Sequence, residues 1–324
     1  MKYRAGAIAL TLTLLFSPVV ATHAASWDLY IGWPGPGSWT TLPYVVAGEK
    51  GFFEKGGVKV RLIAFRGNNL MLAALLAGEI DFGTFLPFFA GSAARGLPVR
   101  IVGSVTKSSG YSMVSRPEIQ SIVGLRGKKI GINSFGSSAD YAAYVALSRN
   151  GLDPNKDATF LAVGGGTQER LAALASGSVD ATVLTSPLEY NAEKQGFKIL
   201  VPMHEMSKLA RIPVTGVATS MKKIEKEPDE IVRVLRALRL STLLIQSRSE
   251  YGVAVFEKIL RLDGASAEKF YHLFRDQYNP ELSLPDAVVE DLLAVGTFRS
   301  KEKDRALANA QAVGDWSFAE KARR

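Results

Sequence analysis

An internal repeat is the sequence feature that most constrains how this chain can fold. Residues 72–83 and residues 171–182 have nearly the same sequence and lie 99 positions apart without a gap. In each copy a run rich in Ala and Leu, typical of a helix, ends at a glycine, Gly78 or Gly177, and an apolar run typical of a buried strand follows. An α-then-β unit that occurs twice predicts two similar lobes, whereas a solenoid needs at least about three repeats.

Each copy of the repeat also carries an aspartate just before the apolar run, Asp81 in the first and Asp180 in the second. Two carboxylates could act as a general acid and base, but their equivalent positions favour a structural role. We therefore predict that each carboxylate accepts hydrogen bonds from backbone amides at a turn.

The rest of the chain predicts an α/β fold of two lobes, with the second lobe inserted into the first. With 324 residues and 47% hydrophobic content, the chain is long enough for about two domains. We assign residues 26–110 and 213–324 to lobe 1 and residues 111–212 to lobe 2. A return strand over residues 212–219 precedes a helical region from Pro228 onward, which we expect to pack on lobe 1. Two chain crossings between the lobes make a hinge that allows closure on a ligand.

The N-terminus has the pattern of a cleavable secretory signal over residues 1–25. Lys2 and Arg4 precede an apolar run over residues 7–16, which is shorter than the roughly 20 residues of a membrane-spanning helix. An uncleaved N-terminal anchor is the alternative. The expected cleavage sites follow Ala21, Ala24 or Ala25.

Composition excludes several classes of site. The chain has no cysteine, so disulfides, thiolate metal sites and a lipid-bearing cysteine are excluded, and we expect a non-lipidated protein in the periplasm. The formal charge of +8 falls to about +6 without Lys2 and Arg4, and the excess is scattered along the sequence. We therefore expect no nucleic-acid partner, although a basic exterior attracts anionic solutes.

Four further segments carry a family resemblance: residues 43–58, 75–83, 125–131 and 177–181. Their order resembles that of the nitrate/sulfonate/taurine-type substrate-binding proteins of ABC importers. The resemblance implies a type II periplasmic-binding-protein fold that traps a small solute between its lobes by hinge closure and delivers it to an ABC permease at the inner membrane. It also implies a monomer without catalysis or cofactor.

Helix N-termini are the best anion cradles that the residues offer, because their backbone N–H groups and positive dipole ends face outward. Two predicted helix starts, residues 38–41 and 136–139, follow strands, where α/β sheets bind ligands; simple helix capping is the alternative. The predicted ligand-binding residues are Ser38, Trp39, Thr40, Asn68, Phe85, Leu86, Tyr111, Gly136, Ser137, Ser138, Thr185, Ser186 and Glu189.

Several of these positions have a second interpretation. Trp39 is either a flat apolar wall with an indole N–H donor or a cover over the core. Asn68 is either a helix cap or a contact, and Tyr111 is hinge, cleft wall or core. The strand ends at Phe85, Leu86, Thr185 and Ser186 are either site or ordinary turn.

Charged residues near these loops also have two interpretations. Glu189 either faces the cleft, and then a cation or a ring nitrogen of the solute, or faces solvent. Arg66 and Arg211 are either counter-charges for an acidic solute or surface residues.

Catalytic patterns are not found. The three histidines, His23, His204 and His272, show no metal-ligand spacing, and no Gly-Xaa-Ser-Xaa-Gly sequence occurs. The fold also resembles that of thiamine-pyrimidine synthase-like enzymes, but these use a cysteine-rich motif that this chain lacks. A ligand-sensing protein for a membrane receptor remains as an alternative to transport.

Overall fold

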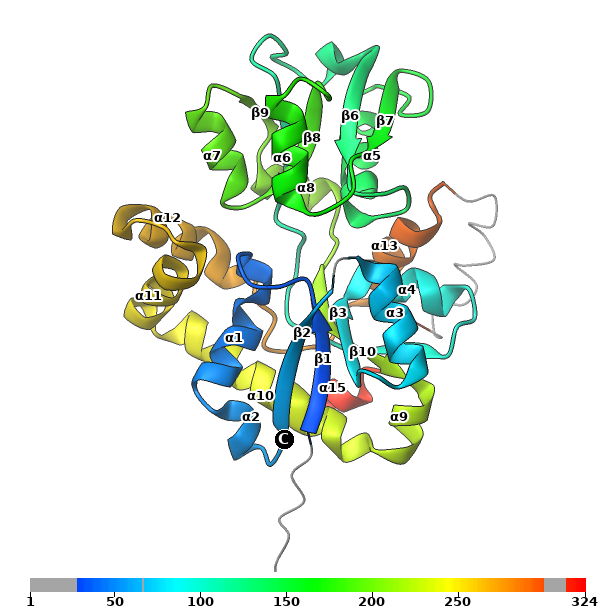
Figure 1. The fold of residues 1–324 in the computed structure, drawn as a ribbon, viewed down its shortest axis with the longest axis vertical. Helices are drawn as coiled ribbons and strands as arrows, with labels where there is room; N and C mark the ends of the chain where they lie inside the picture. The colour runs from blue at the N-terminus through cyan, green and yellow to red at the C-terminus, as the bar shows by residue number, and fades with distance from the viewer. Residues whose placement is uncertain (1–27, 66, 300–312) are drawn as a thin grey trace, which may run out of the picture.

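The computed structural model describes residues 28–65, 67–299 and 313–324, so the predicted signal and Arg66 lie outside the described residues. The chain forms two five-stranded mixed sheets, in the orders β2-β1-β3-β10-β4 and β7-β6-β8-β5-β9 (Figure 1). The strands are β1 (Asp28–Trp33), β2 (Lys59–Ala64), β3 (Phe82–Phe85), β4 (Val99–Ser104), β5 (Tyr111–Ser115), β6 (Lys128–Ile132), β7 (Ala158–Ala162), β8 (Ala181–Thr185), β9 (Lys198–Val201) and β10 (Thr215–Ser220).

The two sheets have the same topology. β1 pairs in parallel with β2 and β3, as β6 does with β7 and β8. The antiparallel member is β10 in the first sheet and β5 in the second. The prediction of two similar α/β lobes is confirmed, and we call each sheet with its helices lobe 1 or lobe 2. The exact boundaries at residues 110 and 212 stay a prediction.

The repeated aspartates fix equivalent strands in both sheets. The Asp81 carboxylate accepts a hydrogen bond from the Tyr30 amide at 2.7 Å, and the Asp180 carboxylate accepts one from the Lys129 amide at 2.8 Å. In return, the Asp81 amide donates to the Tyr30 carbonyl and the Asp180 amide to the Lys129 carbonyl, both at 2.8 Å. The predicted structural role of both aspartates is confirmed.

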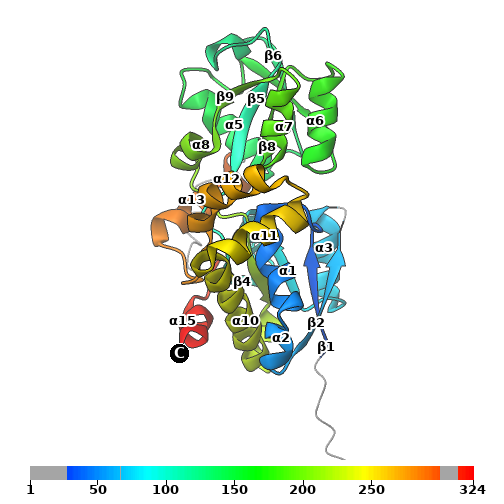
Figure 2. The same ribbon diagram turned by 90° about the vertical axis from the view of Figure 1, so that its left-hand side faces the viewer.

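Helices cover both faces of each sheet (Figure 2). Lobe 1 carries η1 (Trp39–Thr41), α1 (Leu42–Glu49), α2 (Phe52–Lys55), α3 (Asn68–Ala77), α4 (Leu86–Ala94), α9 (Met221–Lys226), α10 (Pro228–Ser247), α11 (Ser249–Leu260), α12 (Gly264–Phe274), η3 (Arg275–Gln277), α13 (Asp286–Thr297) and α15 (Ser317–Arg323). Lobe 2 carries η2 (Val123–Leu125), α5 (Ser138–Ser148), α6 (Thr167–Ala175), α7 (Leu188–Lys194) and α8 (Met203–Leu209). Among the described residues, no helix combines the length and the apolarity that crossing a bilayer requires.

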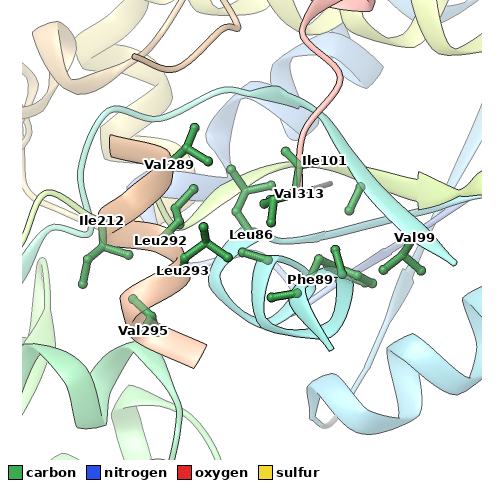
Figure 3. Close-up of a cluster of buried hydrophobic side chains, with 14 of the residues drawn as sticks. Leu86, Phe89, Val99, Ile101, Ile212, Val289, Leu292, Leu293, Val295 and Val313 are labelled. Atoms are coloured by element: carbon green, nitrogen blue, oxygen red, sulfur yellow. The ribbon is translucent and has the colours of Figure 1, made fainter. Parts of the chain in front are cut away.

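The C-terminal helices complete the core of lobe 1. α10 buries Ile231, Val234 and Leu235, whose helical spacing the sequence shows, against strand residues of the first sheet. On the other face of this sheet, α13 packs on α4, and Figure 3 shows Leu292 and Leu293 of α13 beside Leu86. The predicted packing of the helical region on lobe 1 is therefore found.

The two segments that cross between the lobes are bonded to each other. The Val105 amide donates to the Thr215 carbonyl at 3.0 Å. The fully buried Thr106 hydroxyl oxygen accepts from the amides of Val214 and Thr215, both at 3.2 Å. The two crossing segments are therefore hydrogen-bonded to each other rather than being two independent linkers.

The repeat allows a matched test of the corner aspartates. Asp81 also receives a hydrogen bond from the buried Lys223 ammonium at 2.8 Å. We expect Asp81→Ala to lower the free energy of unfolding by about 1 kcal/mol more than Asp180→Ala, because it removes a charged partner as well as a backbone acceptor. Urea denaturation measures both, with Glu225→Ala on exposed α9 surface as control. Equal losses in the two aspartate variants would contradict this account.

Candidate functional site

A cavity of about 630 Å³ lies between the lobes and is lined by both of them. The carboxyl ends of β1 and β2 point toward lobe 2, and those of β6 and β7 point toward lobe 1 (Figure 1). We call the region between these facing ends the seam. The cavity lining comprises Gly67, Asn68, Asn69, Leu70, Pro87, Phe88, Gly91, Arg95, Asn133, Ser134, Phe135, Gly136, Ser137 and Gly164.

The lining favours a small solute with negative charge. It contains the N-terminal ends of two helices, α3 after Gly67 and α5 after Ser137, whose dipoles favour anions. Arg95 is the charged side chain of the lining, and no carboxylate lines the cavity among the described residues. Phe88 and the 58% exposed Phe135 add apolar walls.

A buried ion pair neutralises the Asp140 carboxylate close to this cavity. The Ser137 hydroxyl accepts from the Asp140 amide at 3.2 Å, and the Asp140 carboxylate accepts from the Gly136 amide at 2.9 Å. Asp140 is fully buried, and Arg299 binds both of its carboxylate oxygens, at 2.6 and 2.7 Å. Ser137 therefore caps α5, as the capping interpretation predicts, and it also lines the cavity.

The thirteen residues predicted from the sequence divide between the cavity, the seam around it and the cores of the lobes. Asn68, Gly136 and Ser137 line the cavity. Arg95, Phe88 and Phe135 line it too, although the sequence did not single them out. Arg95 stands at the end of a helix that the sequence predicts, but only the packing of α4 shows which way that helix faces.

Trp39 belongs to the core of lobe 1, so its interpretation as an open wall is corrected. Its side chain is fully buried and stacks on Phe274, with ring centroids 4.8 Å apart. Truncating a buried aromatic side chain of this kind costs about 3–5 kcal/mol. Ser38 caps η1, because its hydroxyl accepts a hydrogen bond from the amide of Thr40 within that helix at 3.3 Å. The Trp39 indole N–H has no hydrogen-bond partner among the described residues.

Leu86 is a second correction. It is the first residue of α4, is fully buried and packs in the cluster of α4 and α13 (Figure 3). Because the chain turns from strand to helix here, the side chain points into the core rather than into the seam. Phe85, the last residue of β3, remains half-buried.

The seam edge of lobe 2 is a cluster of hydroxyl groups. Tyr111 and Ser138 share a hydrogen bond of 2.9 Å, and Thr185 shares one of 3.1 Å with Thr167. Tyr111 and Thr185 are opposite each other in the β5·β8 pair, which places all four groups at one end of the sheet. Tyr111 is 6% exposed and belongs to the core cluster of lobe 2, so its core interpretation holds.

Glu189 is buried, so its interpretation as a solvent-facing residue is wrong. The residue is 1% exposed, and its carboxylate accepts a hydrogen bond from the Ser186 hydroxyl. Burial raises the pKa of Glu189 to about 7, although the Ser186 hydrogen bond opposes the shift. Its second oxygen has no partner among the described residues.

Arg211 is occupied by a structural contact, whereas Arg66 lies outside the described residues. Arg211 pairs with Asp291 of α13 at 3.0 Å. Within the described residues one carboxylate group, Asp81 with Glu227 and Glu230, is compact enough for a metal ion. The Lys223 ammonium contacts all three carboxylates, so we assign this group to an ion-pair cluster.

Comparison with known proteins decides the family. Residues 39–251 match the model of the family described as NMT1/THI5 like. The chain belongs to the NMT1/THI5-like family. A Bacillus subtilis (strain 168) protein that is named as an aliphatic sulfonates-binding protein is 30% identical over 231 residues, which are 68% of this chain and 67% of that protein.

Solved structures show that this NMT1/THI5-like chain has the periplasmic-binding-protein fold. The alkanesulfonate-binding protein SsuA from Xanthomonas axonopodis pv. citri, bound to MOPS, has a TM-score of 0.70 at 20% identity and covers 88% of this chain and 97% of its own. The desulfurization enzyme DSZB has a TM-score of 0.62 at 14% identity and covers 92% and 99%. Since one neighbour binds and the other catalyses, the fold alone does not decide the function.

The burial of Glu189 predicts a pH dependence of stability. Because its folded-state pKa, about 7, lies above the ordinary value of 4.5, the folded state holds a proton that the unfolded state loses. Its contribution to stability is therefore present below pH 4.5 and is lost as the pH rises to about 7. We expect Glu189→Gln to be more stable than the wild type by a margin that grows between pH 5 and pH 8. Denaturant unfolding measures that margin, and a margin equal to that of Glu225→Gln, at an exposed glutamate of α9, at every pH would refute it.

Proposed function

We propose that this protein is the periplasmic solute-binding component of an ABC importer and that it captures a small anionic solute of the sulfonate or nitrate type. The observation that carries this proposal is the inter-lobe cavity, which presents two helix N-termini and Arg95 without an opposing carboxylate among the described residues. The Bacillus subtilis relative named for aliphatic sulfonates supports the same class of solute. The partner is then a permease of the inner membrane, and the receptor is a monomer.

The cavity favours binding over catalysis. Its lining holds no histidine, aspartate, glutamate or lysine among the described residues, so no side chain there is suited to general acid–base work near neutral pH. Asparagine amides, serine hydroxyls and backbone N–H groups can orient an anion without reacting with it. The residues therefore support a receptor rather than a synthase-like enzyme.

Closure of the lobes is the mechanism that we propose for capture. α13 packs on α4 of lobe 1, and Arg299, just beyond α13, reaches the buried Asp140 of lobe 2. Phe298 makes edge contacts with Tyr141 at 5.2 Å and Tyr144 at 4.9 Å. This contact joins the two lobes across the proposed hinge. It therefore stabilises the arrangement of the lobes in which it forms relative to arrangements in which the lobes have moved apart and broken it.

A thermal-shift panel tests the proposed solute class. We expect nitrate, sulfate, ethanesulfonate or acetate to raise the melting temperature, because a ligand that binds the folded state stabilises it. Arg95→Gln should weaken the affinity for the bound anion about tenfold or more, as loss of a charged hydrogen-bond donor does. Arg248→Gln, at an exposed arginine remote from the cavity, is the matched control. If no anion of the panel stabilises the wild type, the proposed function is wrong.

The hinge-spanning ion pair gives a test of closure. We expect Arg299→Gln to raise the radius of gyration in X-ray scattering and to weaken ethanesulfonate binding, because fewer molecules then populate the binding-competent arrangement. The control is Arg323→Gln, which breaks a pair with Glu281 inside lobe 1, at 3.0 Å, and should change neither value. Identical scattering from both variants and the wild type would contradict a role in closure.

A further inference from the structure

Arg170 of α6 is a buried cation that forms no ion pair with the described residues. It is 3% exposed, and no described carboxylate lies within 4.0 Å of its guanidinium group, although the charge of the neighbouring, exposed Glu169 partly offsets the effect of burial. Burial lowers the pKa of Arg170, but an arginine stays charged in proteins. A charge removed from water in this way is costly, unless hydrogen bonds and a nearby anion compensate it.

Three neutral acceptors hold the guanidinium group in one orientation. Its Nε donates to the Val183 carbonyl at 3.0 Å and one terminal nitrogen donates to the Gly166 carbonyl at 3.2 Å. The other terminal nitrogen donates to the Thr167 hydroxyl oxygen at 3.1 Å. The charge is therefore fixed in position, and none of these contacts neutralises it.

The hydrogen bonds continue from Arg170 to the seam. Thr167 and Thr185 share a hydrogen bond of 3.1 Å between their hydroxyl oxygens. Because the Thr167 oxygen already accepts from a cation, its own proton is polarised toward Thr185 as an acceptor. The Thr185 hydroxyl proton is then free to donate elsewhere. Thr185 is half-buried at the carboxyl end of β8, which faces the seam.

The internal repeat shows that the fold itself does not need this arginine. Met71 holds the equivalent position in the first copy, 99 residues earlier, and is buried in the core of lobe 1. The two helices have the same length to within one residue and follow equivalent strands, β2 and β7. An apolar side chain thus satisfies the packing of this unit, and the arginine of lobe 2 is a departure that packing does not explain.

We propose that Arg170 is a positioning residue that determines specificity for an anionic group. Acting through Thr167, it presents the Thr185 hydroxyl as a fixed donor at the seam and supplies positive charge behind it. The inference rests on the proposed function and names the part of lobe 2 that selects the charge of the solute. Thr185 is outside the cavity lining in the described arrangement, and in this proposal it contacts the solute once the lobes close, whereas Arg170 does not.

Binding of a matched pair of probes tests this inference. Ethanesulfonate is an anion, and ethyl methyl sulfone is a neutral molecule of similar shape. We expect calorimetry to show that Thr185→Val and Arg170→Met each weaken ethanesulfonate binding about tenfold or more, as loss of a charge-assisted donor does, and leave sulfone binding unchanged. The double variant should lose little beyond the larger single loss, because both residues belong to one chain of hydrogen bonds.

Two controls separate this role from a structural one. Thr159→Val, at an exposed threonine of β7, should bind both probes as the wild type does. Arg170→Met introduces the residue that lobe 1 has at the equivalent position, Met71, so we expect this variant to fold. If it does not fold, the Thr185→Val variant, at a half-buried position, still tests the inference. An unchanged ratio of the two affinities in Thr185→Val overturns the inference alone. If the wild type binds neither ethanesulfonate nor any anion of the panel, the proposed function fails and the inference fails with it.

Discussion

The reciprocal hydrogen bonds between an aspartate and a neighbouring strand are the interaction on which the rest of this structure depends. In lobe 1 they join Asp81 to Tyr30, and in lobe 2 they join Asp180 to Lys129. Each pair holds the strand after the repeated helix against the central parallel strand. The carboxyl ends of both parallel sets of strands face one another, and the N-termini of α3, which follows β2, and α5, which follows β6, line the cavity between them.

Charge is distributed unequally around the cavity. Lobe 1 contributes the Arg95 side chain, and lobe 2 contributes backbone and hydroxyl donors with Arg170 behind them. The carboxylates nearby are either paired, as Asp140 is with Arg299, or biased toward the neutral form, as burial does for Glu189. The cavity itself therefore suits an anion, since no carboxylate is among the lining residues that the structure describes.

The sequence predicted the parts of this molecule that depend on local patterns. The repeat, the roles of Asp81 and Asp180, and the helical region after Pro228 all follow from spacing and turn chemistry. Trp39 and Leu86 were misplaced because residues that follow a strand can point into the core or into the seam, and only tertiary packing decides. One signal in the sequence was overlooked. Arg170 lies 99 positions after Met71, so lobe 2 has an arginine where the equivalent helix of lobe 1 has an apolar residue.

The hydrogen-bonded crossing segments at Thr106 and Thr215 indicate where lobe 2 can be removed or exchanged by recombining gene segments. The chain leaves the first sheet after β4 and returns to it at β10 on adjacent backbones, so residues 107–213 form one continuous insertion between these two strands. Joining residue 106 to residue 214 would retain all five strands of the first sheet. Such a shortened protein would contain lobe 1 without lobe 2. Exchanging residues 107–213 between relatives would create chimaeras whose two lobes come from different proteins.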